Sequence, residues 1–142
     1  MNVSFTYKRW AAALSGHGSI GNWNYYNVAS DNEALSDLWV NSFVSNRLSS
    51  CARTNFETAE YLSDYYVRDA SFFKLDNFTI GYTFPKLFSA AKRNVALNIY
   101  GTVQNIYAIT GYDGLDPEIF QGIDGNFYPR PRTYTLGIKL NF

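Results

Sequence analysis

The carboxy-terminal segment constrains the fold more than any other feature of the chain. From Arg130 to Phe142, apolar and polar side chains alternate without interruption. The apolar positions are Tyr134, Leu136, Ile138, Leu140 and Phe142. Because successive strand side chains point to opposite faces, this pattern predicts a strand with one apolar and one polar face. A soluble sandwich can show the same alternation. An aromatic final residue and a length near the roughly 9–11 residues of a membrane-spanning strand favour a transmembrane barrel.

Two further segments upstream show the same two-faced pattern. Asn77 to Phe84 carries Phe78, Ile80, Tyr82 and Phe84 on one parity, and 94–109 carries Val95, Leu97, Ile99, Gly101 and Val103. We expect 85–93 to connect them, with Pro85 ending the strand ladder. Phe73 and Leu75 fall on the opposite parity from Phe78, which predicts a β-bulge near Asp76–Asn77.

The whole chain therefore predicts an all-β fold. Five strands are expected, at about 2–8, 10–28, 69–84, 94–109 and 130–142, with a tight turn between Tyr7 and Trp10. The long connections, 29–68 and 110–129, are expected on the extracellular side, because outer-membrane barrels have short periplasmic turns. Five strands cannot close a barrel, since the smallest have about eight and open edges do not survive in lipid. Residues 1–142 are accordingly predicted to be part of a transmembrane antiparallel β-barrel.

Composition excludes several other classes of function. The net charge is zero and the pI is about 6.5, which gives no sign of a nucleic-acid partner. Cys51 is a single cysteine, so no internal disulfide is expected. His17, the single histidine, is expected to be a solvated residue of the barrel lumen. The residues suggest no catalytic set and no cofactor, and the prediction is that the protein is not an enzyme.

Four linked blocks of the sequence carry a family resemblance. The first runs from Asp69 to Tyr82 and reads DASFFKLDNFTIGY, followed closely by Pro85. The others are Asn98–Tyr107, Gly114–Glu118 and Tyr128–Gly137. In this order they resemble the carboxy-terminal region of SusC/RagA-type TonB-dependent transporters, whose pattern is DASF-x-[RK]-L-x-N-[ILF]-[ST]-[IL]-G-Y. The resemblance covers about residues 61–142, and Gly21–Asn27 matches more loosely.

The resemblance implies a barrel of roughly 22 strands, to which this chain would supply the last five. It also implies an outer-membrane location in a Gram-negative cell and import of oligosaccharides or peptides. A SusD-like surface lipoprotein would close the extracellular mouth, and TonB would supply energy. The signal peptide, plug and TonB box of the family are expected to lie outside this sequence.

Several residues are candidates for functional contacts. In this class, the last strand is expected to be read by the barrel-assembly machinery along its edge, through Tyr134, Leu136, Ile138, Leu140 and Phe142. Aromatic residues of the long connections are candidates for contacts with substrate or lipoprotein: Trp39, Tyr112, Phe120, Phe127 and Tyr128. Packing within the loop is the favoured interpretation for the last four rings, and packing of a short helix on the extracellular rim for Trp39.

Two weaker expectations concern the same connections. Four acidic residues supply oxygen atoms of the kind that Ca²⁺ prefers, although their spacing is not that of an EF-hand: Asp113, Asp116, Glu118 and Asp124. No metal site is the favoured interpretation. Ala34, Leu35, Leu38, Trp39 and Phe43 have helical spacing and predict a short amphipathic helix.

Two other classes of protein remain open at this point. A soluble β-barrel or sandwich that binds a ligand would turn Leu136 and Ile138 inward, towards a core. A passive porin would share the barrel but would lack the plug and the energy coupling.

Overall fold

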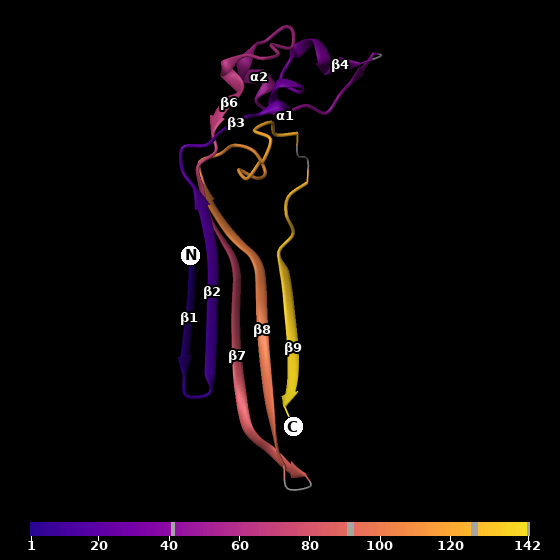
Figure 1. Cartoon of the computed structure of the whole chain (residues 1–142). Coiled ribbons are helices and arrows are strands. Elements are labelled where there is room, and N and C mark those ends of the chain that lie inside the picture. Colours follow the sequence, from indigo (N-terminus) through magenta and orange to yellow (C-terminus); the bar gives the residue numbers. More distant parts are fainter. Residues whose placement is uncertain (41, 91–92, 126–127, 142) are drawn as a thin grey trace. The chain divides into compact units, whose positions relative to one another are not determined.

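A computed structural model describes residues 1–40, 42–90, 93–125 and 128–141 of the chain. The chain divides into two compact units (Figure 1). Unit 1 comprises Met1–Gly18, Phe73–Ile109 and Arg130–Phe142, and unit 2 comprises Ser19–Phe72 and Thr110–Pro129. Each unit is described separately below.

Unit 1 is a single sheet of five strands. The strands are β1 (Asn2–Tyr7), β2 (Trp10–Ser19), β7 (Phe72–Ala90), β8 (Arg93–Thr110) and β9 (Thr133–Asn141). They lie in the order β1-β2-β7-β8-β9, side by side as long ribbons in Figure 1. The five predicted strands are confirmed, with changed bounds. The chain enters and leaves unit 2 at one end of the sheet, so the turn between β1 and β2 lies at the other end.

The tight turn predicted between Tyr7 and Trp10 is confirmed. β1 and β2 pair antiparallel from Asn2↔Ser15 to Tyr7↔Trp10, which leaves only Lys8 and Arg9 in the turn. Lys8 adopts a left-handed backbone with φ of 55°, as tight hairpin turns require at such positions. The hairpin places Val3 beside Leu14 and Phe5 beside Ala12 on one face of the sheet.

The final strand begins later than expected. β9 pairs antiparallel with β8 from Gln104↔Thr133 to Ala96↔Asn141. The expected start at Arg130 is wrong because Pro131 has no N–H to donate to a ladder. Asn105 of β8 adopts φ of 53° at this point, and its side-chain amide donates to the Pro131 carbonyl at 2.9 Å. The Asn105 side chain thus connects β8 to the residues before β9, where Pro131 cannot donate a backbone hydrogen bond.

The expectation that Pro85 ends its strand is also wrong. β7 continues through Pro85 to Ala90, and β8 starts at Arg93. Thr83 donates its N–H to the Arg9 carbonyl in the β1–β2 turn, at 2.9 Å. N–H groups two residues apart point to the same side of a strand, so Pro85 faces the region beyond that turn. Because β2 begins only at Trp10, after the turn, the missing N–H of the proline costs no ladder bond to a described β2 residue.

The β7 strand changes its exposed parity as the bulge prediction requires. Phe73 is exposed near the start of the strand, and Phe78, Ile80 and Phe84 are exposed further along. The exposed apolar side chains therefore move from odd to even positions between Phe73 and Phe78.

Unit 2 is built from short elements. Its strands are β3 (Trp23–Tyr25), β4 (Trp39–Val40), β5 (Phe43–Val44) and β6 (Val67–Asp69), and its helical turns are α1 (Asn27–Ser30), η1 (Leu35–Leu38), α2 (Cys51–Thr54) and η2 (Asp64–Tyr66). β3 pairs antiparallel with β6, and β4 with β5. The helices in the described part of the chain are all too short to cross a bilayer.

Two predictions for unit 2 are wrong. The strand expected over 10–28 breaks after Ser19, and Gly21 adopts φ of 82° before the chain re-enters β3. The amphipathic helix expected around Ala34 to Phe43 is a single 3₁₀ turn followed by the β4–β5 hairpin. Trp39 and Phe43 suit strands, and the polar residues between them favour a turn over a continued helix.

The buried apolar side chains lie almost entirely in unit 2. Among the described residues, Val95 is the one such side chain in unit 1, and the others belong to unit 2: Val28, Ala29, Ala34, Cys51, Tyr66, Ala70, Phe72 and Tyr112. The sheet of unit 1 therefore has no buried core of its own.

Candidate functional site

The sheet of unit 1 presents a continuous apolar face. Register places Leu97 beside Leu140 and Ile99 beside Ile138 at one side of the sheet. The β1–β2 hairpin adds Val3, Phe5 and Tyr7 to the same face, near the opposite edge of the sheet. These side chains are not covered: Leu136 is 79% exposed and Ile138 67% exposed. An exposed apolar surface of this extent marks a site that contacts lipid or another protein.

The predicted barrel-assembly residues lie on the outermost strand of this sheet. Tyr134, Leu136, Ile138 and Leu140 are all exposed on β9, while Phe142 lies outside the described residues. β8 is the partner of β9 on one side, and the other edge of β9 is open. An open edge with unpaired backbone groups is a template for pairing with another strand.

The opposite face of the sheet is polar and internally hydrogen-bonded. The hydroxyls of Thr79 and Thr102 lie 2.9 Å apart, and Asn98 donates its amide to the Thr83 hydroxyl at 2.8 Å. Tyr100 lies over Gly137, where an added Cβ would stand 2.3 Å from the tyrosine ring. The ring can lie flat against the sheet because glycine has no side chain at that point.

His17 forms a contact that sequence reasoning missed. Its Nδ1 lies 2.7 Å from the Asp76 carboxylate, and both side chains are partly exposed. The two residues are on neighbouring strands, β2 and β7, and are 59 positions apart in the sequence. The pairing depends on the register between those strands, so no local pattern could have shown it.

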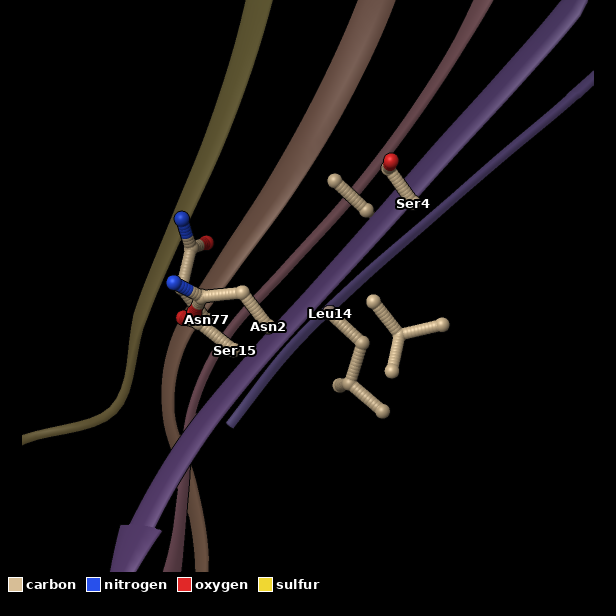
Figure 2. A pocket seen from close by; sticks show the side chains of 7 residues that line it. Asn2, Ser4, Leu14, Ser15 and Asn77 are labelled. Carbon is tan, nitrogen blue, oxygen red and sulfur yellow. The ribbon is translucent and has the colours of Figure 1, made fainter.

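The amino-terminal part of the sheet has a small hollow of about 180 Å³. Figure 2 shows that Asn2, Ser15 and Asn77 gather on one side of the β2 ribbon, whereas Leu14 points to the other. Residues of both faces thus line this hollow, where β1, β2 and β7 lie together. Its volume is below the roughly 300–1,000 Å³ of ligand pockets, and we do not assign a ligand to it.

A short motif segment anchors the chain where β6 leads into β7. Ala70 is fully buried, and its N–H donates to the Asn22 carbonyl at 2.9 Å. The Asn22 amide returns a hydrogen bond to the Ala70 carbonyl, and the Ser71 hydroxyl accepts from Gly21. Asp69 accepts from Ser71, and this bonding holds the pKa of the Asp69 carboxyl below its usual value. The Asp-Ala-Ser residues therefore fix the strand break that begins after Ser19.

Unit 2 contains a buried pair of tyrosine and carboxylate. Tyr112 donates its hydroxyl to Asp124 at 2.7 Å, and Asp124 is completely buried. The Asp124 backbone also bonds to Tyr25 and Val28, so the 110–129 connection is tied to the segment that follows β3. Burial, followed by the hydrogen bond and charge of Asp124, raises the pKa of Tyr112. The phenol stays protonated and acts as a donor.

Aromatic rings pack edge to face around Tyr66. The Tyr66 ring contacts Tyr25, Phe56 and Tyr65, with ring centroids 5.1–6.4 Å apart. Burial, and then the negative charge of Glu33, raises the pKa of Tyr66 to about 12. Burial and the charge of Asp124 raise the pKa of the neighbouring Tyr26 as well. Tyr66, the most deeply buried of these rings, thus belongs to the core of unit 2.

The candidate contact residues divide into exposed and buried side chains. Trp39, Phe120 and Tyr128 are exposed and free to contact another molecule. Tyr112 is buried: its ring packs inside the loop and its hydroxyl is used by Asp124. Phe127 lies outside the described residues.

In three of the four weak calcium candidates, the side-chain carboxylate has an identified partner within the protein. Asp113 lies 3.6 Å from Arg68, Asp116 accepts from the Glu118 N–H, and Asp124 accepts from Tyr112. Within the described ranges, no group of three or more histidine, cysteine or acidic side chains is arranged to hold a metal ion.

Comparison with characterised proteins gives close sequence relatives. No protein-family model matches the chain. TonB-dependent receptor SusC from Bacteroides thetaiotaomicron is 38% identical over 140 residues, which is 96% of this chain and 14% of the relative. TonB-dependent receptor P3 from Formosa agariphila is 30% identical over 93 residues, or 57% of this chain and 9% of the relative. The chain thus spans about a seventh of the length of SusC.

Solved structures show the same fold. The structure of the RagAB peptide transporter matches 99% of this chain and 16% of its own, with a TM-score of 0.72 and 21% identity. The "closed-closed" state of the RagAB peptide importer gives a TM-score of 0.75 at 20% identity, again over 99% of this chain and 16% of the other. The two units together thus have the fold of a segment of the RagAB transporter chain. The chain belongs to the SusC/RagA family and corresponds to a carboxy-terminal segment of such a protein.

Proposed function

We propose that this chain supplies five strands to the barrel wall of a TonB-dependent importer in the outer membrane. The observation that carries the proposal is the sheet of unit 1, which is apolar and exposed on one face and polar on the other. In a barrel wall, the apolar face contacts lipid and the polar face lines the lumen. The identity to SusC supports a transporter of this class.

The two alternative functions fit less well. A soluble binding protein would cover Leu136, Ile138 and their neighbours, but unit 1 is a single sheet without a second layer. A passive porin would have the same wall. The similarity to two TonB-dependent receptors favours an importer that is coupled to energy, through a plug and TonB box supplied by other parts of the protein.

The proposal for the cargo and the lid concerns unit 2. Three of its exposed aromatic side chains are proposed to stack on sugar rings or to pack under a lipoprotein: Trp39, Phe120 and Tyr128. We propose oligosaccharides as the main cargo, with peptides as the alternative, since RagAB is described as a peptide transporter. A SusD-like lipoprotein is the proposed partner of this surface.

Fractionation of cells that express the full-length protein tests the membrane assignment. We expect the protein in the outer membrane, and we expect its gel mobility to change on boiling, as intact barrels show. Recovery of the full-length protein in the soluble fraction, without a shift on boiling, would contradict the proposed barrel.

Paired substitutions test the role of the exposed aromatic side chains. Trp39→Ala and Phe120→Ala are expected to lower capture of the lipoprotein or uptake of oligosaccharide, while barrel assembly stays normal. Phe43→Ala is the matched control for an exposed ring of the same connection. Equal lipoprotein capture and uptake in all variants would remove Trp39 and Phe120 from the proposed surface.

The proposed recognition of β9 by the barrel-assembly machinery has its own test. In the full-length protein, Leu140→Asp should slow assembly, because it places a charge on the exposed apolar edge strand. Asn141→Asp adds the same charge at the neighbouring position, which register places on the polar face. Pulse-labelled appearance of the heat-modifiable form measures the rate, and an equal delay in both variants would argue against recognition of the apolar side chains.

A further inference from the structure

The zero net charge of the chain conceals a strong separation of charge between the two units. Eleven of the twelve acidic residues lie in unit 2, and nine of the twelve lysines and arginines lie in unit 1. Unit 1 therefore has a net charge of +8 and unit 2 a net charge of −8 at pH 7. Asp76, the single acidic residue of unit 1, is paired with His17. Unit 1 thus carries far more positive than negative charge.

Several of these cations lie near the β1–β2 turn. Lys8 and Arg9 form that turn, and Thr83 of the adjoining β7 donates its N–H to the Arg9 carbonyl. Lys86 of β7 and Arg93 of β8 follow in the same sheet. The turn lies at the opposite end of β2 from Ser19, where the strand ends. In the proposed barrel it faces the inner leaflet of the outer membrane, where the headgroups of phospholipids lie.

The structure places Lys8 on the apolar side of its turn. Its Nζ lies over the Tyr7 ring, 5.3 Å from the centroid. Tyr7 pairs with Trp10, and both rings are exposed on the same face as Val3 and Phe5. A cation held over this ring stands at the border of the apolar face.

An aromatic cluster marks the same border. Trp10 contacts Tyr82 edge to face at 4.9 Å, and Tyr82 contacts Phe84 at 4.6 Å between ring centroids. Aromatic rings of this kind gather at the headgroup level of a membrane, with apolar side chains on the hydrocarbon side. An occupant of this site needs a negative group beside Lys8 and an apolar chain along Phe5 and Val3.

We propose that Lys8, with the Tyr7 and Trp10 rings, binds the phosphate of an anionic phospholipid. The acyl chain of that lipid lies along the apolar face of β1 and β2, and its headgroup meets the ammonium of Lys8. The charge of the turn end and the amphipathic surface beside it both match this chemistry. The inference rests on the proposed membrane location and adds a defined lipid site to it.

Lipid titration of the full-length protein tests this site. The protein, purified in detergent, is titrated with phosphatidylglycerol and, in parallel, with phosphatidylcholine, and native mass spectrometry counts the bound lipids. Wild-type protein should bind phosphatidylglycerol more tightly. Lys8→Gln should weaken that binding about five-fold, as expected for the loss of one cation near an anionic lipid.

Lys139→Gln is the matched control. It removes the same charge, but register places Lys139 beside Asn98 on the polar face, away from lipid. The control should bind phosphatidylglycerol as the wild type does, and Lys8→Arg should retain most of the affinity. Equal affinity of wild type and Lys8→Gln, or an equal loss in Lys139→Gln, would overturn the lipid site.

The two proposals fail in different ways. Protein that inserts into the outer membrane and shifts on boiling, yet shows no dependence on Lys8, would overturn the lipid site alone. Wild-type protein that is missing from the outer membrane would overturn both the site and the proposed barrel.

Discussion

The two units of this chain place their apolar side chains in opposite ways. Unit 2 buries Tyr66 and Tyr112 and satisfies a buried carboxylate, Asp124, with a tyrosine hydroxyl. Unit 1 leaves Leu136 and Ile138 exposed and keeps its hydrogen-bonded polar side chains on the other face. In unit 2 burial removes apolar side chains from water, whereas in the proposed barrel lipid covers the apolar face of unit 1.

A charge on the apolar face of unit 1 gives the largest expected effect. In the full-length protein, Ile138→Arg should destabilise the barrel by about 2–4 kcal/mol, the cost of arginine near the bilayer midplane. Thr135→Arg is the control, because register pairs Thr135 with Thr102 on the polar face and an arginine there reaches water. Urea unfolding in liposomes measures both variants. Similar losses of unfolding free energy in the two variants would show that lipid does not contact one face and water the other.

The second prediction concerns the buried pair of unit 2. Tyr112→Phe removes the hydroxyl that donates to buried Asp124, which should cost about 1–3 kcal/mol within that unit. The effect should be confined to the 110–129 connection, because the sheet does not contain this pair. Protease susceptibility of that connection, together with normal heat-modifiable mobility, measures it. Tyr128→Phe, at an exposed ring, should leave the protease susceptibility of the connection unchanged. Loss of the heat-modifiable form in Tyr112→Phe would contradict the expectation that this pair stabilises unit 2 alone.

A smaller effect should appear at high pH. Tyr66 keeps its proton in the folded protein up to a pKa of about 12, whereas an unfolded tyrosine loses it above about pH 10. The unfolded state then binds fewer protons, so the stabilisation is complete below pH 10 and is lost as pH rises towards 12. The loss should be about 1 kcal/mol at pH 11. Protease protection of unit 2 between pH 9 and 12 measures it. Tyr66→Phe should remove only the Tyr66 share of the dependence, because the pKa values of Tyr26 and Tyr112 in the same unit are also raised.

The sequence predicted unit 1 far better than unit 2. Alternation at Tyr134, Leu136, Ile138 and Leu140 reports directly on a strand with two faces, because its period is local. The strand ends were less predictable, since they depend on neighbours: Pro85 is tolerated inside β7 because β2 has already turned away at Arg9. Local pattern gives the face of a strand, and tertiary context gives its length.

Unit 2 resisted prediction for a physical reason. The contacts that build it join distant residues, such as Tyr112 with Asp124 and Asn24 with Pro117, and leave no periodic trace. The helical spacing of Leu35, Leu38 and Trp39 suggested a helix, but polar residues between the apolar ones turn the chain into a hairpin. The burial of Tyr112 follows from a hydrogen bond that sequence patterns do not contain.

The smallest expected effect tests how closely the polar face of unit 1 is packed. Gly137→Ala places a Cβ 2.3 Å from the end of the Tyr100 ring, a contact that the ring must leave. Because a tyrosine ring can swing towards the lumen, the cost should be below about 1 kcal/mol. Gly101→Ala is the matched control, since an added Cβ there meets its nearest atom at 4.0 Å. Urea unfolding of both full-length variants, alone and with Tyr100→Ala, measures the effect. If Tyr100→Ala does not remove the cost of Gly137→Ala, the strain lies in the backbone and not in the ring, and the polar face is stiffer than its hydrogen bonds suggest.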